Sequence, residues 1–514
     1  MHELGALSWS GAACIVLTLG LSGARAQGLA QELVCNIGSR LELFVDEYLI
    51  ESMSGVTREL HAPERKGPVM ILDRPWEGAF CYYFTLFQDG DIYRMYYRGN
   101  PVNPRATYAD FPNYAGAEVT CYAESRDGIH WRRPNLNLFQ GDFATDRYGN
   151  PFTLPASNNI VWVGQGPLLH STHNFSPFKD ANPACRPEAR YKAVARTFEW
   201  KGYENGMAGL LGFQSPDAIH WSLVQEDPII ISPGLDGHNV VFWDAYRGRY
   251  VEFERGGFRN GYRDMATRTS PDFIHWTPGP MELQWFDWGV PPDQHVYTSP
   301  TLAYFRAPHI FLGFANRLVG GRVWVEEHPE HEISDAIFMS SRDGLHFDRS
   351  FMEGWIRPGL DPNKESWIHG NTSPAWGILQ TGPEELSVYW VDHYQLAYIS
   401  QLQRGTLRLD GFVSMHAKYG GGEFTTKPLS FTGRELVMNF STSAVGSVRV
   451  EIQDQAANPI PGFTLADCPE IYGDAIEQAV KWAGGSDVSA LAGQVVRLRF
   501  VMKDADLYAI RFRP

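Results

Sequence analysis

Four copies of a seven-residue motif recur in this chain, and they constrain its fold more than any other feature. The copies occupy residues 125–131, 215–221, 270–276 and 341–347, and they share the pattern Ser-x-Asp-x-aliphatic-His-aromatic. Serine, aspartate and a nearby glycine or proline favour a tight turn in which the aspartate side chain accepts backbone N–H bonds. One constant turn at unequal intervals is typical of propeller blades joined by loops of different length. The motif is therefore predicted to be structural, not catalytic.

A second repeated unit, a pair of apolar strands joined by a turn, gives the number of blades. Each motif copy is expected to join the third and fourth strands of its blade, and residues 41–46 are expected to complete the last blade. The fold class predicted is all-β, a five-bladed β-propeller followed by a C-terminal β-sandwich. The expected strand pairs are 82–87 with 93–98, 173–178 with 191–196, 239–243 with 250–255, 298–305 with 309–317, and 375–379 with 386–393.

Changes in the sequence pattern divide the chain into three parts. Residues 1–26 are predicted to be a signal peptide, because the apolar run 12–21 precedes a small-x-small cleavage site at Ala24-Arg25-Ala26. Residues 27–405 are assigned to the propeller and residues 406–514 to an accessory β-sandwich. Within that sandwich only the stretch from Tyr472 to Trp482 is compatible with a helix. The accessory part lacks the blade motif, so we expect it to stabilise the propeller.

The signal peptide predicts a secreted or periplasmic protein with no membrane partner after cleavage. The net charge is −15 with no offsetting basic stretch, which excludes a nucleic-acid partner. Aromatic residues make up 13% of the chain, a content that suits both β structure and stacking on sugars. The oligomeric state is left open.

Polar residues precede the first strand of each expected blade. In a propeller the first strands line the central channel, so these groups are predicted to face one cavity and bind a polyol. The alternative is that they satisfy loop backbones. The candidate substrate-binding residues at strand starts are Trp76, His173, Asn174, His238, Asn239, His295, Tyr297, His369 and Asn371.

Carboxylates stand among these strand starts, and a pair of them could carry glycoside hydrolysis, which needs one acid and one base or nucleophile. Glu77, Asp236 and Asp293 are the predicted catalytic residues, with Glu77 favoured as the acid. We expect two of the three within about 5–10 Å of each other. The acid is expected to be the carboxyl farthest from arginine, because arginine favours the ionised form.

Arginines and histidines leave two alternatives open. Arg98, Arg196, Arg255 and Arg317 recur at one blade position. Facing the channel they would bind a carboxylate or sulfate, and facing outward they would form ordinary strand-end ion pairs. The histidines of the strand starts lack a local metal-ligand spacing, so no metal and no cofactor are predicted.

The hairpin turns, Pro75-Trp76-Glu77 and the trailing domain together resemble five-bladed propeller glycoside hydrolases of families thirty-two, forty-three and sixty-eight, and the related mannoside phosphorylases. The segments 44–51 and 291–295 resemble segments of uncharacterised exported bacterial proteins described as family-thirty-two-like. The family-thirty-two signatures Asn-Asp-Pro-Asn, Arg-Asp-Pro and Glu-Cys are absent, so no catalytic residue carries over from them. The resemblance implies an exported glycoside hydrolase with a carbohydrate substrate. A lyase acting on a uronate-containing glycan and a non-catalytic glycan-binding propeller are the alternatives.

Overall fold

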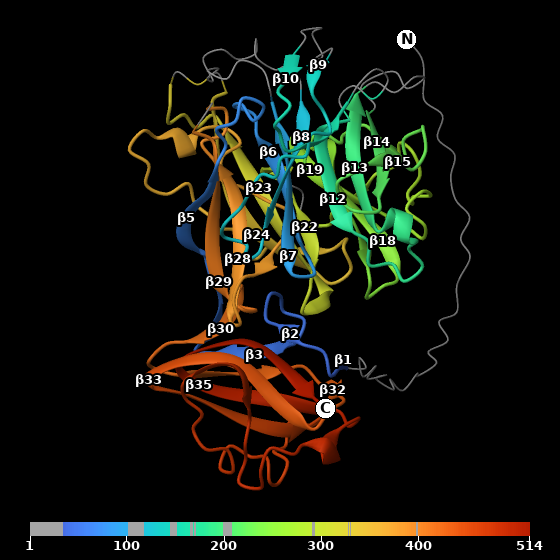
Figure 1. Ribbon diagram of the computed structural model, residues 1–514. Helices are drawn as coiled ribbons and strands as arrows, with labels where there is room; N and C mark the ends of the chain where they lie inside the picture. The colour runs from blue at the N-terminus through green and yellow to red at the C-terminus, as the bar shows by residue number, and fades with distance from the viewer. Residues whose placement is uncertain are drawn as a thin grey trace, which may run out of the picture.

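A computed structural model gives the structure of the chain (Figure 1). It describes residues 34–100, 118–143, 152–164, 168, 171–198, 208–289, 293–326, 328, 330–396 and 399–514. The predicted signal peptide, residues 1–26, lies outside this described part. None of the helices in these ranges has the length and apolarity that a bilayer crossing needs.

Five antiparallel sheets form the propeller, as the sequence predicted. In blade one the strand order is β11-β8-β7-β6, and in blade three it is β17-β18-β19-β20. Blades one to three contain β6 (Tyr82–Asp89), β7 (Ile92–Gly99), β8 (Val119–Ser125), β11 (Ile160–Val163), β12 (His173–Lys179), β13 (Tyr191–Phe198), β14 (Ala208–Ser215), β15 (Ser222–Leu223), β16 (Ile230–Ser232), β17 (Val240–Asp244), β18 (Arg249–Arg259), β19 (Tyr262–Ser270) and β20 (Gln284–Trp285).

The last two blades complete the ring. Blade four packs its strands around the long β23, and blade five around β28 and β29. Their strands are β21 (His295–Thr298), β22 (Thr301–Tyr304), β23 (Ala307–Gly320), β24 (Glu332–Ser341), β25 (Phe347–Asp348), β26 (Ser373–Pro374), β27 (Leu379–Gln380), β28 (Glu385–Asp392), β29 (Gln401–Arg408) and β5 (Glu64–Ile71). A separate hairpin pairs β9 (Gly141–Phe143) with β10 (Phe152–Leu154), and short 3-10 helices occupy η3 (Pro187–Ala189), η4 (Glu365–Trp367) and η5 (Ser489–Leu491).

The ring is closed by β5, which pairs with β29 as the outer strand of blade five. The expectation that residues 41–46 perform this closure is wrong. Within that stretch β2 (Glu42–Leu43) pairs instead with β35 (Val496–Arg513) of the second domain. An N-terminal strand therefore joins the C-terminal strands of the second domain, and the apolar pattern of 41–46 reflects burial at the domain interface.

All four motif copies form the same turn between the third and fourth strands of their blades. In the copy at 215–221, Asp217 accepts the N–H groups of Ile219 and His220 at 2.9 Å, and its other oxygen lies 2.7 Å from the His220 Nδ1. The fourth motif residue has a positive φ in every copy: Gly128, Ala218, Phe273 and Gly344. Blade three tolerates Phe273 there because its ring is buried in the core.

The motif aspartates make the propeller acid-sensitive. Partial burial works to raise the pKa of Asp217, but hydrogen bonds from His220 and Ile219 outweigh it and lower that pKa to about 2. The pKa of Asp272 is also about 2 by the same balance. Because the folded pKa lies below the unfolded value of about 3.9, these carboxylates stabilise the fold above that pH, and their contribution disappears as the pH falls toward 2.

We therefore expect the melting temperature to drop steeply between about pH 4 and pH 2. Asp217→Asn keeps an acceptor oxygen but removes the titrating charge, so the drop should be shallower in this variant. Differential scanning calorimetry across that pH range measures both. Identical pH dependence in the variant and the parent would show that the turn does not contribute to acid sensitivity.

The second domain lies below the propeller in Figure 1 and is built on one ten-stranded mixed sheet. It draws strands from both ends of the chain, so the boundary predicted at 405 misses its N-terminal part. The predicted helix at Tyr472–Trp482 contains β34 instead. The strands of the second domain are β1 (Cys35–Gly38), β2, β3 (Ile50–Ser54), β4 (Val56–Leu60), β30 (Val413–Ala417), β31 (Gly422–Thr426), β32 (Leu429–Phe431), β33 (Glu435–Asp454), β34 (Asp474–Ala479) and β35.

An apolar seam joins the two domains. Phe412 packs its ring against Phe314 and Phe338 of blade four, with ring centroids 6.2 and 5.9 Å apart. Asp410 accepts a hydrogen bond from the Tyr304 hydroxyl at 2.6 Å. Buried aromatic contact and a buried hydrogen bond of this kind fix the second domain beneath the ring, on the side away from the polar strand starts.

Candidate active site

Asp236 is the carboxylate that the structure places at the channel mouth. It lies in the loop between β16 and β17, and its side chain is 50% exposed although charged groups surround it. The His173 Nε2 lies 3.3 Å from its Oδ1, the Arg196 Nη1 lies 3.2 Å from the same oxygen, and the Arg255 guanidinium pairs with Oδ2. A carboxylate held by three groups yet open to solvent is suited to act on a bound substrate.

These neighbours keep Asp236 ionised. Burial alone would raise its pKa, but the hydrogen bond from His173 and the charges of Arg255 and Arg196 hold the pKa well below the usual range for aspartate. Asp236 is therefore an acceptor and base, not a proton donor, at any physiological pH.

The loop that carries Asp236 is fixed by buried amides. Asn174 donates to the carbonyl oxygens of Leu235 and Gly237, and Asn239 donates to that of Leu235 at 2.8 Å. A Cβ added at Gly234 would lie about 2.0 Å from the Arg255 carbonyl oxygen, so the close approach of this loop to β18 requires glycine. Asn174 and Asn239, predicted to bind substrate, instead position Asp236.

A second acidic group stands on the blade-five side of the mouth. The His369 Nδ1 lies 3.0 Å from the Glu332 Oε2, and its Nε2 lies 3.3 Å from the Glu330 Oε2. The Gln395 side-chain amide donates to Glu330 at 3.3 Å. The hydrogen bond from His369 is the main cause of a lowered pKa at Glu332. His369 thus links the two glutamates across its ring, a geometry that allows a proton to pass between them.

Tyr297 lies between the two acidic groups. Burial raises its pKa; the charges of Asp236 and Glu330 raise it further, while Arg255 and Arg263 oppose them. Its ring packs edge-on against His369 with centroids 5.2 Å apart, and the Arg255 guanidinium lies 5.1 Å from the ring centroid. The charges of Asp236 and Glu330 therefore both act on the Tyr297 phenol.

Aromatic and neutral groups form the deeper wall. The His238 Nε2 lies 3.1 Å from the Thr85 hydroxyl, and burial lowers the pKa of His238 to about 3, so its imidazole stays neutral. The Tyr83 ring lies against both His173 and His238. The Arg98 guanidinium lies over the Tyr83 ring, 4.9 Å from its centroid. Flat aromatic faces beside charged acceptors are typical of sugar-binding cavities.

Glu77 and Trp76 do not reach this cavity. Glu77 is fully buried, accepts hydrogen bonds from the Tyr97 hydroxyl and Arg133 at 2.7 Å, and has a pKa raised by burial against the opposing charge of Arg133. The Trp76 ring is buried and its Nε1 donates to Asn159 at 2.7 Å. Both residues connect the start of blade one to the outer part of that blade through hydrogen bonds, so their role is structural.

Asp293, His295 and Arg317 line a neighbouring cavity of about 630 Å³ between blades four and five. Asp293 is exposed there, and Arg317 is held by Asp335 at 2.8 Å. The His295 ring contacts Tyr262 and accepts the Arg263 N–H at 3.0 Å. These residues are not grouped with Asp236, although Arg263 also lies over the Tyr297 ring and so connects the two cavities.

The sequence left two alternatives for the arginines: facing the channel to bind an anionic ligand, or facing outward in ion pairs. The structure combines parts of both. Arg98, Arg196 and Arg255 face the channel, but they pair with acids there: Arg98 lies 3.3 Å from Glu118, and the other two pair with Asp236. Their charges therefore serve mainly to hold carboxylates. Asn371 likewise has a structural partner, since its Oδ1 accepts the Tyr394 N–H at 2.7 Å.

Sequence reasoning missed Glu118, Glu330 and Glu332. Glu330 lies in the connection between β23 and β24, and Glu332 is the first residue of β24, which is not the innermost strand of its blade. The signal that could have found them is the run of glutamates and histidines from 326 to 332, which is unusually charged for a blade hairpin. Glu118 carries no comparable signal.

Comparison with known proteins identifies no family and no close relative of the chain. No protein-family model matches the chain, and no curated protein matches it. Solved structures with a similar fold include a complex of BT0996 with RGII (13% identity, covering 68% of this protein and 93% of the other, TM-score 0.42). A putative glycoside hydrolase from Bacteroides ovatus has 12% identity, coverage of 70% and 97%, and a TM-score of 0.38. A thermostable family-43 glycoside hydrolase has 8% identity, coverage of 65% and 91%, and a TM-score of 0.38.

Proposed function

We propose that the protein is an exported glycoside hydrolase whose active site is formed by the residues around Tyr297. The observation that carries the proposal is that Tyr297 contacts a partner of each carboxylate: its ring packs against His369, which pairs with Glu330, and lies under Arg255, which pairs with Asp236. Glycoside hydrolysis needs one ionised carboxylate and one protonated acid across the scissile bond. The substrate class is an oligosaccharide or polysaccharide.

Asp236 is the base or nucleophile in this proposal, because three neighbours keep it ionised. Glu330 is the general acid. Of the two carboxylates it is the one that contacts His369 and Gln395 instead of two arginines, and arginine would drive it to ionise. Glu330 regains its proton from the incoming water or from solvent after each cleavage, and His369 holds Glu330 in position through its contacts with both glutamates.

A lyase is the second candidate, since Tyr297 and three channel arginines could serve proton abstraction beside a uronate. Such a mechanism needs a tyrosine that ionises readily, and the raised pKa of Tyr297 opposes it. The raised pKa of Tyr297 therefore favours hydrolysis over elimination. A glycan-binding propeller without activity is separated from both by product analysis.

Glu330→Gln tests the acid. On oligosaccharides with poor leaving groups, we expect kcat/KM to fall by a factor of about 10² to 10⁴. On an aryl glycoside whose leaving group needs no protonation the loss should be small, and the alkaline limb of the pH profile should disappear. Steady-state kinetics on both substrate types measures the difference.

Asp293→Asn is the matched control, because Asp293 is an exposed carboxylate in the neighbouring cavity. It should leave kcat within about twofold of the parent. An Asp293→Asn variant as inactive as Glu330→Gln, or equal losses of Glu330→Gln on both substrate types, would refute the assignment.

A further inference from the structure

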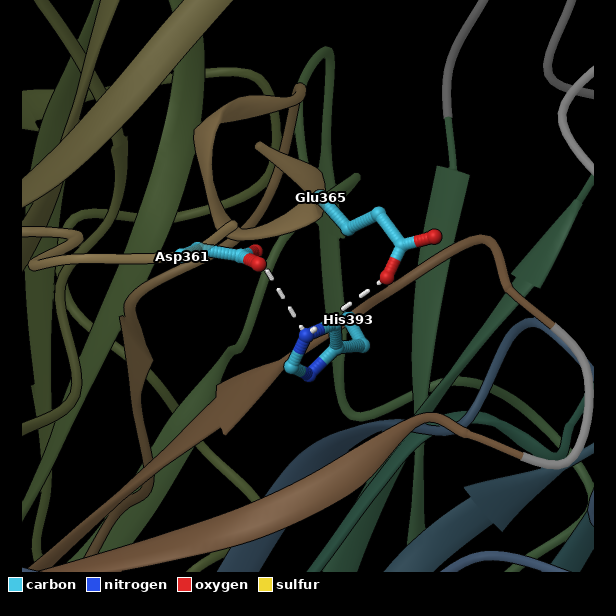
Figure 2. A group of neighbouring side chains, drawn as sticks. All are labelled: Asp361, Glu365 and His393. Atoms are coloured by element: carbon cyan, nitrogen blue, oxygen red, sulfur yellow. Dashed lines mark ion pairs between the residues drawn. The ribbon is translucent and has the colours of Figure 1, made fainter. Parts of the chain in front are cut away.

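A cluster of two carboxylates and one imidazole lies outside the channel site. Asp361, Glu365 and His393 each offer one ligand atom, and these atoms lie within 4.8 Å of one another (Figure 2). Asp361 and Glu365 come from the segment before blade five, and His393 directly follows β28. All three side chains are partly buried.

The distances fit a metal ion better than a hydrogen bond. The His393 Nε2 lies 3.5 Å from the Asp361 Oδ2 and 3.8 Å from the Glu365 Oε2, beyond the usual hydrogen-bond length of about 2.7–3.2 Å. A tetrahedral ion with bonds of about 2.0–2.2 Å holds its ligands about 3.3–3.6 Å apart. The three side chains in Figure 2 point toward one another.

A positive charge at this point would be stabilised by the two carboxylates. A neutral imidazole facing two carboxylates with its lone pair is repelled by both. Among the described residues, the ion pairs of Asp361 and Glu365 are with His393 alone. In this part of the structure no ion pair brings a lysine or arginine to the two carboxylates, so a bound cation would offset their charge.

Contacts outside the cluster orient its ligands. The Gln401 side-chain amide contacts the His393 Nδ1, which leaves Nε2 directed at the carboxylates. The Asp361 Oδ2 accepts the Ser366 N–H at 2.7 Å and its hydroxyl at 3.0 Å. The Ser366 bonds are made to the same oxygen that faces His393, so they fix the orientation of the Asp361 carboxylate directly.

We propose that Asp361, Glu365 and His393 bind a divalent transition-metal ion, with Zn²⁺ as the best fit and Mn²⁺ as the alternative. An imidazole ligand favours these ions over Ca²⁺ and Mg²⁺. The ion ties η4 to the end of β28. Because His369 follows η4 by two residues, the ion would also steady the segment that carries His369 into the channel.

The test is calorimetric titration of Zn²⁺ into full-length, tag-free protein stripped with a chelator. We expect one equivalent to bind with micromolar or tighter affinity and to raise the melting temperature. Glu365→Gln, whose partner here is His393, should weaken binding at least about tenfold. The control Glu353→Gln makes the same change at an exposed site and should not alter binding.

Failure to bind one equivalent, or equal affinity in Glu365→Gln, would show that these three residues do not form a metal site. If Glu365→Gln does not fold, X-ray absorption of the zinc-loaded parent decides. One nitrogen and two carboxylate oxygens from the protein support the proposal, whereas a shell of several imidazoles contradicts it.

Discussion

Asp236→Asn should abolish glycoside hydrolysis while leaving the fold intact. The amide keeps the size of the side chain but removes the charge that Asp236 presents to the cavity. A variant without its base or nucleophile is expected to lose a factor of about 10³ or more in kcat on every substrate, aryl glycosides included. That pattern differs from the leaving-group dependence expected of Glu330→Gln.

The variant also leaves Arg196 and Arg255 without their anionic partner, so its fold must be checked by circular dichroism and melting temperature. Rescue with a small external nucleophile such as azide would support a nucleophilic or basic role. A folded Asp236→Asn variant with parental activity would remove Asp236 from the mechanism.

Ending the chain after Arg408 should abolish soluble expression. The truncation deletes β30 to β35 and strips the partner strands from β1, β2, β3 and β4. It also uncovers the seam around Phe314, Phe338 and Trp355. Each large apolar side chain returned to water costs about 1.5–3 kcal/mol, against a total stability of about 5–15 kcal/mol.

Soluble yield and size-exclusion chromatography measure this outcome. A truncation that begins at β5 and ends after Arg408 is the informative companion, because it also removes the unpaired N-terminal strands. A monodisperse, stable and active propeller from either variant would show that the second domain is dispensable.

Local patterns predicted the propeller well because its turns repeat. Ser215, Asp217 and their three counterparts encode a turn whose hydrogen bonds are complete within a few residues, so the local sequence is enough to specify it. Ring closure was missed because pairing of β5 with β29 joins residues more than three hundred positions apart, and no local feature specifies it.

The candidate site shows the same difference between local and long-range information. Asp236 is a candidate by sequence because it precedes an inner strand, and the structure places it beside His173, Arg196 and Arg255. Glu77 also precedes one, but whether such a carboxylate faces the channel or Arg133 depends on packing that spacing does not report. Glu330 lies in the connection between β23 and β24, and only the folded chain brings it to Tyr297. Which side chains from neighbouring strands and blades pair with a carboxylate therefore decides whether it can reach a substrate, and residue type alone does not.

The most direct test of the proposed function is product analysis after digestion of plant and algal polysaccharides in water labelled with heavy oxygen. Hydrolysis predicts that each new reducing end carries one heavy oxygen atom, and that Asp236→Asn forms no such product. An unsaturated uronate product without the label would establish a lyase instead. Glycan binding without any product from the parent enzyme would contradict catalysis at this site altogether.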